Sequence, residues 1–176
     1  MKGRLLFCLF TAVFLLFLPG CKTKAAPLQL PSQLAQPFKA KAIIEYDGLS
    51  ISTLFSKEAE NRFHLEFQGP KPLEGMSMLF ETDLVTISYR GLTGSYRPGS
   101  LPQAAVGQLL TEAVGLLCQG EKIQLELDGS ALKATGVLTG KEDSFAAVID
   151  ASSGTLKTLV IPDRDFGVTF EDFSFQ

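Results

Sequence analysis

Residues 38–56 have the sequence FKAKAIIEYDGLSISTLFS, which is the clearest β-hairpin in this chain. Apolar residues stand at every second position from Phe38 to Tyr46, and charged residues occupy most of the positions between them. Asp47-Gly48 then supplies a two-residue turn of the kind that joins antiparallel strands. Apolar residues alternate with serines after the turn. A period of two indicates half-buried strands, so the stretch predicts an antiparallel sheet with one apolar face.

The same alternation recurs along most of the chain, and short polar connections separate the runs. We expect about eleven strands, six before a single helix and five after it, in a mainly β (α+β) domain. Their predicted ranges are 38–46, 49–56, 62–68, 76–80, 85–89 and 92–96, then 123–127, 132–138, 145–149, 156–161 and 166–175.

One helix is predicted near residues 101–118, where apolar residues recur at helical spacing. Ser100 is a candidate N-cap, with Gln103 completing a capping box and Pro102 in the first turn. Gly120 is a candidate C-terminal cap. Gly107 and Gly115 each weaken a helix by up to about 1 kcal/mol relative to alanine, so we expect the helix to depend on tertiary packing.

The dimensions of these elements predict a curled sheet. Eleven strands at about 4.8 Å spacing give a sheet roughly 50 Å wide. A helix of about 17 residues is roughly 25 Å long and 10 Å across, so it covers only part of one face. The remaining apolar face is larger than soluble monomers tolerate. We therefore expect a half-barrel with the helix as a lid in its concavity, or a ligand or partner held there.

The first 20 residues have the features of a bacterial lipoprotein signal peptide. Lys2 and Arg4 form a positive n-region, and an apolar run of about 14 residues follows, too short to span a membrane comfortably. The run closes on Leu18-Pro19-Gly20-Cys21, which resembles a lipobox. Cleavage before Cys21 would expose its thiol and amine for acylation, so we expect a lipid anchor on the extracytoplasmic side of a cell membrane.

Residues 21–37 are predicted to be the lipidated cysteine and a spacer, because three prolines punctuate small and polar residues. Fully extended, this spacer would reach roughly 50 Å, with room for a short helical turn around residues 32–36. Residues 38–176 form the predicted folded domain.

The net charge argues against one class of function, and the cysteine content argues against an internal disulfide. Loss of residues 1–20 removes two basic residues and no acidic one, which leaves 14 basic residues against 19 acidic ones and a formal charge of −5. This balance argues against binding to nucleic acid. Cys118 is the only cysteine beyond Cys21, so no internal disulfide is expected, and its apolar neighbours favour an inert buried thiol.

No catalytic or metal-binding constellation is present in the sequence. His64 is the single histidine, and the alternation places it on the polar side of its strand. The acidic residues near the C-terminus lack calcium-loop spacing, and no phosphate-binding loop or serine elbow occurs. We predict that the protein is not an enzyme, and we predict no cofactor and no metal. A hydrolase using His64 or those acidic residues is the weakest alternative.

The order of six strands, one helix and five strands resembles the lipoprotein-carrier fold of the outer-membrane lipoprotein-sorting family. The segments 148–150, 153–156 and 166–173 are similar to the strand-turn-strand tail of that family. The resemblance implies a curled antiparallel half-barrel with an apolar cavity for acyl chains. Anchored relatives include lipoprotein receptors, lipid carriers and a spore-germination lipoprotein that binds a cell-wall amidase.

Two functions follow as hypotheses. In the first, the concave apolar face binds a lipid, a lipoprotein acyl chain or another hydrophobic ligand. The predicted contacts are Phe63, Leu65, Phe67, Met76, Met78 and Phe80 from the strands, with Leu109 and Leu110 from the helix. In the second, the half-barrel is filled by its own side chains, and its edges or rim bind a cell-envelope protein as a non-catalytic adaptor.

Overall fold

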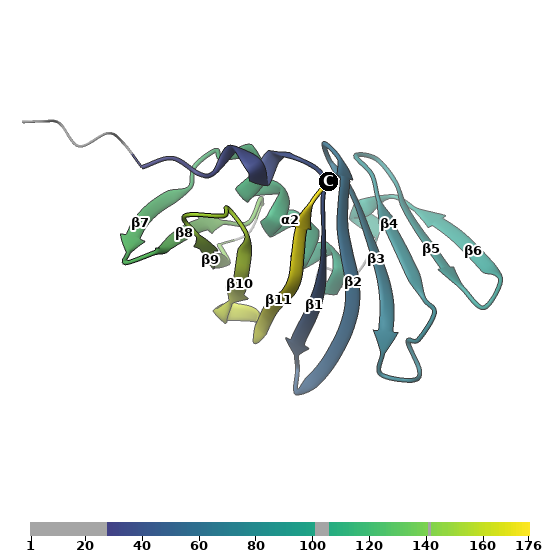
Figure 1. Ribbon diagram of the computed structural model, residues 1–176. Helices are drawn as coiled ribbons and strands as arrows, with labels where there is room; N and C mark the ends of the chain where they lie inside the picture. The colour runs from purple at the N-terminus through teal and green to yellow at the C-terminus, as the bar shows by residue number, and fades with distance from the viewer. Residues whose placement is uncertain (1–27, 101–105, 141) are drawn as a thin grey trace, which may run out of the picture.

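The computed structural model of the chain describes residues 28–100, 106–140 and 142–176 (Figure 1). The predicted signal peptide, the lipobox at Cys21 and the capping residues Pro102 and Gln103 lie outside the described residues. Within them, the chain forms one eleven-stranded sheet and one α-helix, α2 (Val106–Gln119). Short 3-10 turns are η2 (Ser32–Ala35), η3 (Pro98–Ser100) and η4 (Pro162–Arg164).

The strands agree with the predicted number and order. Their bounds are β1 (Phe38–Tyr46), β2 (Leu49–Ala59), β3 (Arg62–Gly69), β4 (Ser77–Phe80), β5 (Val85–Tyr89), β6 (Leu92–Tyr96), β7 (Gln124–Asp128), β8 (Ala131–Val137), β9 (Ser144–Asp150), β10 (Leu156–Ile161) and β11 (Phe166–Phe175).

The first and last strands pair in the middle of the sheet. The strand order is β6-β5-β4-β3-β2-β1-β11-β10-β9-β8-β7, so each half of the chain is an antiparallel meander. β1 pairs with β11 from Phe38 opposite Phe175 to Tyr46 opposite Phe166. This pairing leaves β6 and β7 as the two edges. The segment between them, which carries η3 and α2, has to cross from one edge to the other.

The sheet is curled and open, with α2 in its concavity (Figure 1). Residues at alternate positions of the hairpin point to the concave face, and Phe38, Ala42 and Ile44 are fully buried there. Their neighbours on the convex face, such as Lys39 and Glu45, are exposed. The predicted fold class, a half-barrel with a lid helix, is confirmed.

The helix ends where the sequence indicates. α2 runs to Gln119, one residue beyond the predicted end, and Gly120 adopts a positive φ of 69°. The Gly120 amide donates to the Leu116 carbonyl at 3.0 Å, which satisfies one of the last carbonyls of the helix. Apolar residues of α2 are fully buried against the concave face, namely Leu109, Leu110, Ala113, Val114 and Leu117.

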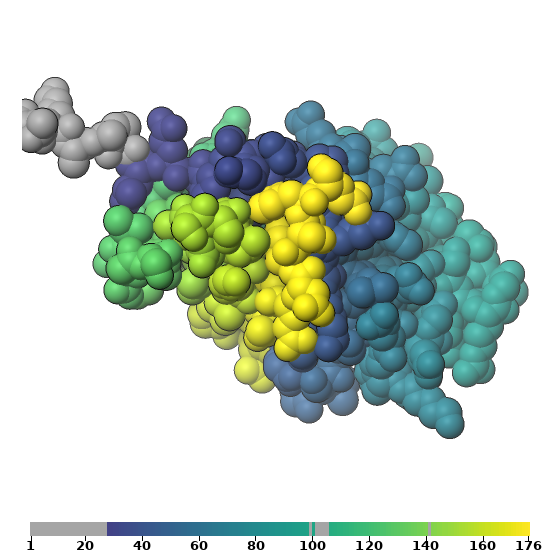
Figure 2. Space-filling view, viewed as in Figure 1, coloured from purple at the N-terminus to yellow at the C-terminus, as the bar shows by residue number. Residues whose placement is uncertain are grey.

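Residues 28–37 lie along one end of the half-barrel and form what we call the strap (Figure 2). Its turn η2 confirms the short helical turn predicted there, and Leu34 within it is 2% exposed. The Gln176 amide donates to the Pro37 carbonyl at 3.0 Å, which ties the strap to the C-terminal residue.

The two glycines inside α2 have different surroundings. A Cβ added to Gly107 would lie 2.7 Å from Phe80 Cζ, a distance that real Cβ atoms do not adopt. A Cβ added to Gly115 would lie 3.9 Å from Phe63 Cε2, an ordinary van der Waals contact. Gly107 therefore allows α2 to approach β4 closely, whereas a methyl group at Gly115 would fit without displacing its neighbours.

We predict opposite effects for the two alanine substitutions. Gly115→Ala should raise the free energy of unfolding by up to about 1 kcal/mol through helix propensity alone. Gly107→Ala should lower it by about 1–3 kcal/mol, because overpacking against Phe80 outweighs the same gain in propensity. Urea unfolding followed by circular dichroism measures both, and equal stabilisation by the two substitutions would contradict the close approach at Gly107.

Candidate binding site

The predicted ligand contacts come together on the concave face. Phe63, Leu65, Phe67, Met78 and Phe80 are at most 7% exposed, and Leu109 and Leu110 are fully buried. Met76 is partly buried against the same cluster. These side chains pack mainly on one another beneath α2, so most of the concave face is filled by the protein itself. Their contact with a ligand stays a prediction.

Two adjoining hollows remain open along one side of α2, and together we call them the α2 groove. The larger has a volume of about 570 Å³ and runs from Phe63 past Phe80 to Pro98. The smaller has a volume of about 290 Å³ and reaches the strap at Ala35. Both are lined by Asn61, Phe63, Gly115 and Gln119.

The walls of the α2 groove are partly apolar and partly polar. The apolar part of the wall includes Phe63 and Phe80, two of the eight predicted contacts, together with Leu116. Asn61, Gly115 and Gln119 also line the groove, although no sequence pattern predicted them as contacts. Asn61 lies in a hairpin turn with a positive φ of 55°, and the other two lie outside the buried stripe of α2. Only the docking of α2 against the β2–β3 turn brings these residues together.

Gln108 adds a polar feature to the larger hollow. Its side-chain Oε1 atom is buried, and no donor among the described residues bonds to it. A buried carbonyl oxygen without a donor costs about 1–3 kcal/mol relative to a bonded one.

The smaller hollow contains a buried lysine and a buried thiol. Lys57 is 4% exposed and faces the concave side, since it lies opposite Phe38 on β1 and Phe63 on β3. Its ammonium donates to the Ala35 carbonyl of the strap. The Cys118 thiol donates to the neighbouring Leu34 carbonyl at 3.0 Å. Burial raises the pKa of Cys118 to about 11, and the charge of Lys57 opposes that shift. The thiol is therefore protonated near neutral pH, as expected for an inert cysteine.

The inner face of β5 and β6 extends beyond α2, and we call it the β6 rim. Leu92 is 79% exposed there, and Tyr96 is also exposed. On the outer face of the same strands, paired hydroxyls replace apolar side chains, with Thr86 and Ser95 oxygens 3.2 Å apart. The rim therefore exposes apolar side chains on the concave side of an edge strand.

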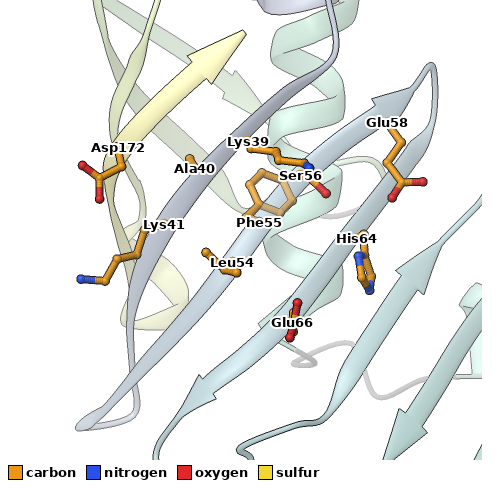
Figure 3. Close-up of a pocket in the computed structure, with 10 residues that line it drawn as sticks. All are labelled: Lys39, Ala40, Lys41, Leu54, Phe55, Ser56, Glu58, His64, Glu66 and Asp172. Atoms are coloured by element: carbon orange, nitrogen blue, oxygen red, sulfur yellow. The ribbon is translucent and has the colours of Figure 1, made fainter. Parts of the chain in front are cut away.

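A shallow hollow of about 320 Å³ lies on the convex face (Figure 3). His64 and Glu66 from β3 line it with Lys39 and Lys41 from β1, while α2 lies behind the sheet. Lys41 is already paired with Glu171 at 3.0 Å. The prediction that His64 lies on the polar side of its strand is confirmed. The mixture of both charge signs on an open surface indicates a solvated face.

Metal-binding clusters and membrane-spanning helices are both absent from the part of the chain that the structure describes. Over residues 28–100, 106–140 and 142–176, no group of three or more metal-ligating side chains occurs. No helix in those ranges is long and apolar enough to cross a membrane.

Comparison with known proteins shows the fold. No family model and no curated protein matches the sequence. An uncharacterized conserved protein from Thermus thermophilus aligns with a TM-score of 0.54 at 13% identity, over 84% of this chain and 83% of that one. A chain in the complex of the CwlD amidase with the GerS lipoprotein, from Clostridioides difficile, aligns with a TM-score of 0.51 at 16% identity, over 80% and 87%.

A LolA superfamily protein from Nitrosomonas europaea aligns with a TM-score of 0.42 at 8% identity, over 85% of this chain and 94% of that one. Identities this low describe a likeness of fold. The curled antiparallel sheet with one helix, which the sequence predicts, is the architecture that the strand order shows.

The thiol of Cys118 should react slowly despite lining the smaller hollow. At pH 8, iodoacetamide should alkylate the folded chain from Lys22 onward at least tenfold more slowly than the same chain in urea, because a pKa of about 11 leaves little thiolate. Intact-mass measurements over time give both rates. Equal alkylation rates in the folded and unfolded chains would show that the Cys118 thiol is not buried and that its pKa is not raised.

Proposed function

We propose that this chain is an extracytoplasmic lipoprotein that binds the apolar chain of a lipid or lipoprotein in the α2 groove. The observation that carries the proposal is the larger hollow, which stays open beside α2 although most of the predicted contacts are buried in the core. Its volume of about 570 Å³ falls within the range of about 300–1,000 Å³ typical of small-molecule sites. The proposed activity is binding, without a catalytic step.

Acyl chains on Cys21 would hold the domain at the extracytoplasmic side of a cell membrane. The lipobox and the apolar run before it support this part of the proposal. A groove tethered to a bilayer in this way would have access to lipids and to other acylated proteins.

Filling the groove should abolish binding without unfolding the protein. Gly115 lines both hollows, and its position in α2 accepts a larger side chain, so Gly115→Leu should occupy their junction. Native mass spectrometry of residues 22–176, before and after organic extraction, should show a lipid adduct on the wild type that extraction removes. The adduct should fall at least tenfold in Gly115→Leu and persist in Gly115→Ala.

The controls separate the parts of this proposal. Circular dichroism should show equal helix content in the three proteins. Intact mass of the chain purified from membranes should correspond to residues 21–176 plus acyl groups, and Cys21→Ser should lose that mass. A wild type that carries no lipid and takes up none when mixed with phospholipid would overturn lipid binding and favour the second candidate function.

The second candidate function is a non-catalytic adaptor that binds a cell-envelope enzyme. The observation that favours it is the β6 rim, where an edge strand with unpaired backbone groups exposes Leu92 on its inner face. The match to a chain in the amidase–lipoprotein complex supports an enzyme of cell-wall metabolism as the partner.

Matched variants on β6 test the adaptor. Leu92→Glu places a charge on the apolar inner face, and Thr93→Glu places the same charge on the polar outer face. If the rim binds a partner, chemical crosslinking in solubilised envelopes should give one stoichiometric complex that Leu92→Glu abolishes and Thr93→Glu retains. Equal loss or equal retention in the two variants would contradict a partner at the inner face of the rim.

A further inference from the structure

Lys57 is the one charged residue among the fully buried side chains of the described ranges. Burying an ammonium is costly unless a carboxylate or several hydrogen-bond acceptors compensate for the lost water. Among the described residues, no carboxylate lies within 4.0 Å of the Lys57 ammonium. Its one hydrogen bond to a described residue goes to the Ala35 carbonyl, although an ammonium has three donors.

The position of Lys57 links this charge to the α2 groove. Lys57 lines the smaller hollow, whose volume is about 290 Å³. Asn61 and Gln119 line the same hollow, and the Gln119 amide donates to Asn61 Oδ1 at 3.4 Å. Both residues also line the larger hollow, so the two spaces meet at these amides. Carboxylates line both hollows, Glu60 the smaller one and Glu81 and Glu112 the larger one.

The apolar wall lies farther along the same groove. Phe63 borders both hollows, and Phe80 and Leu116 border the larger one. Lys57, at the end beside the strap, is the one basic residue among the described residues that line the two hollows. An amphiphile with an anionic end and one hydrocarbon chain fits this arrangement with its anion at Lys57 and its chain on the apolar wall.

We propose that Lys57 binds the anionic end, a carboxylate or a phosphate, of an apolar chain whose hydrocarbon lies against Phe63 and Phe80. The inference rests on the proposed lipid-binding function and adds the chemical class of the ligand. The side-chain NH₂ groups of Asn61 and Gln119 donate further hydrogen bonds at the same end. The strap closes that end of the groove, because Lys57 and Cys118 hold its Ala35 and Leu34 carbonyls.

Three probes with the same sixteen-carbon chain test the inference: palmitate, a lysophosphatidate and hexadecanol. The protein is the chain from Lys22 onward, which contains every described helix and strand. The wild type should bind palmitate, the lysophosphatidate or both at least tenfold more tightly than hexadecanol. A preference for only one of the two anions would distinguish a carboxylate-bearing ligand from a phosphate-bearing one.

Three variants assign that preference to Lys57. Lys57→Met should remove the difference between the anionic probes and hexadecanol, and Lys57→Arg should retain most of it. Gln119→Glu adds a carboxylate to the hollow and leaves the bond between Lys57 and the strap in place. Gln119→Glu should weaken binding of the anionic probes at least tenfold and leave hexadecanol binding unchanged. This variant therefore tests whether the anion binds at this end of the groove even if Lys57→Met fails to fold.

The outcomes separate this inference from the proposed function. Equal affinity of the wild type for all three probes would overturn the role of Lys57 and leave chain binding intact. Failure of every probe to bind would overturn lipid binding itself. An anionic preference that survives in both Lys57→Met and Gln119→Glu would place the anion site elsewhere on the molecule.

Discussion

The pairing of β1 with β11 is the contact on which the rest of the structure depends. Because the first and last strands meet in the middle of the sheet, β6 and β7 become its edges. The connection between those edges must cross the sheet, and the concave face is the side on which α2 can bury its apolar stripe. A helix of 14 residues is about 21 Å long and the sheet is roughly 50 Å wide, so the crossing covers the face only in part.

That partial cover accounts for both candidate surfaces. Where α2 approaches β4 through Gly107, the sheet and the helix are in close contact. Where Gly115 faces Phe63, the same helix leaves the α2 groove. Beyond the helix, the β6 rim stays uncovered. The two proposed functions would therefore use different parts of one concave face, and Gly107 marks the place where the helix lies closest to β4.

The strap joins the N-terminal end of the described chain to this face. Leu34 fills the core, and Lys57 and Cys118 bond to consecutive strap carbonyls from β2 and α2. A residue that anchors the strap is thus also the cation of the groove.

The sequence by itself determined the local features. Alternation with a period of two depends only on neighbouring residues, so the eleven strands, the inward side of each and the end of α2 at Gly120 could be predicted. The lipobox at Cys21 is a local pattern of the same kind, and its lipidation stays a prediction. The tertiary structure decided the features that join distant residues. Lys57 and Ala35 are 22 residues apart, and Asn61 and Gln119 are 58 apart, so no short-range pattern records that they meet. The eight predicted contacts lie on the concave face, as the alternation indicated, but the packing of α2 buries most of them. The groove is lined instead by residues such as Asn61 and Gln119, which no local sequence pattern predicted as contacts.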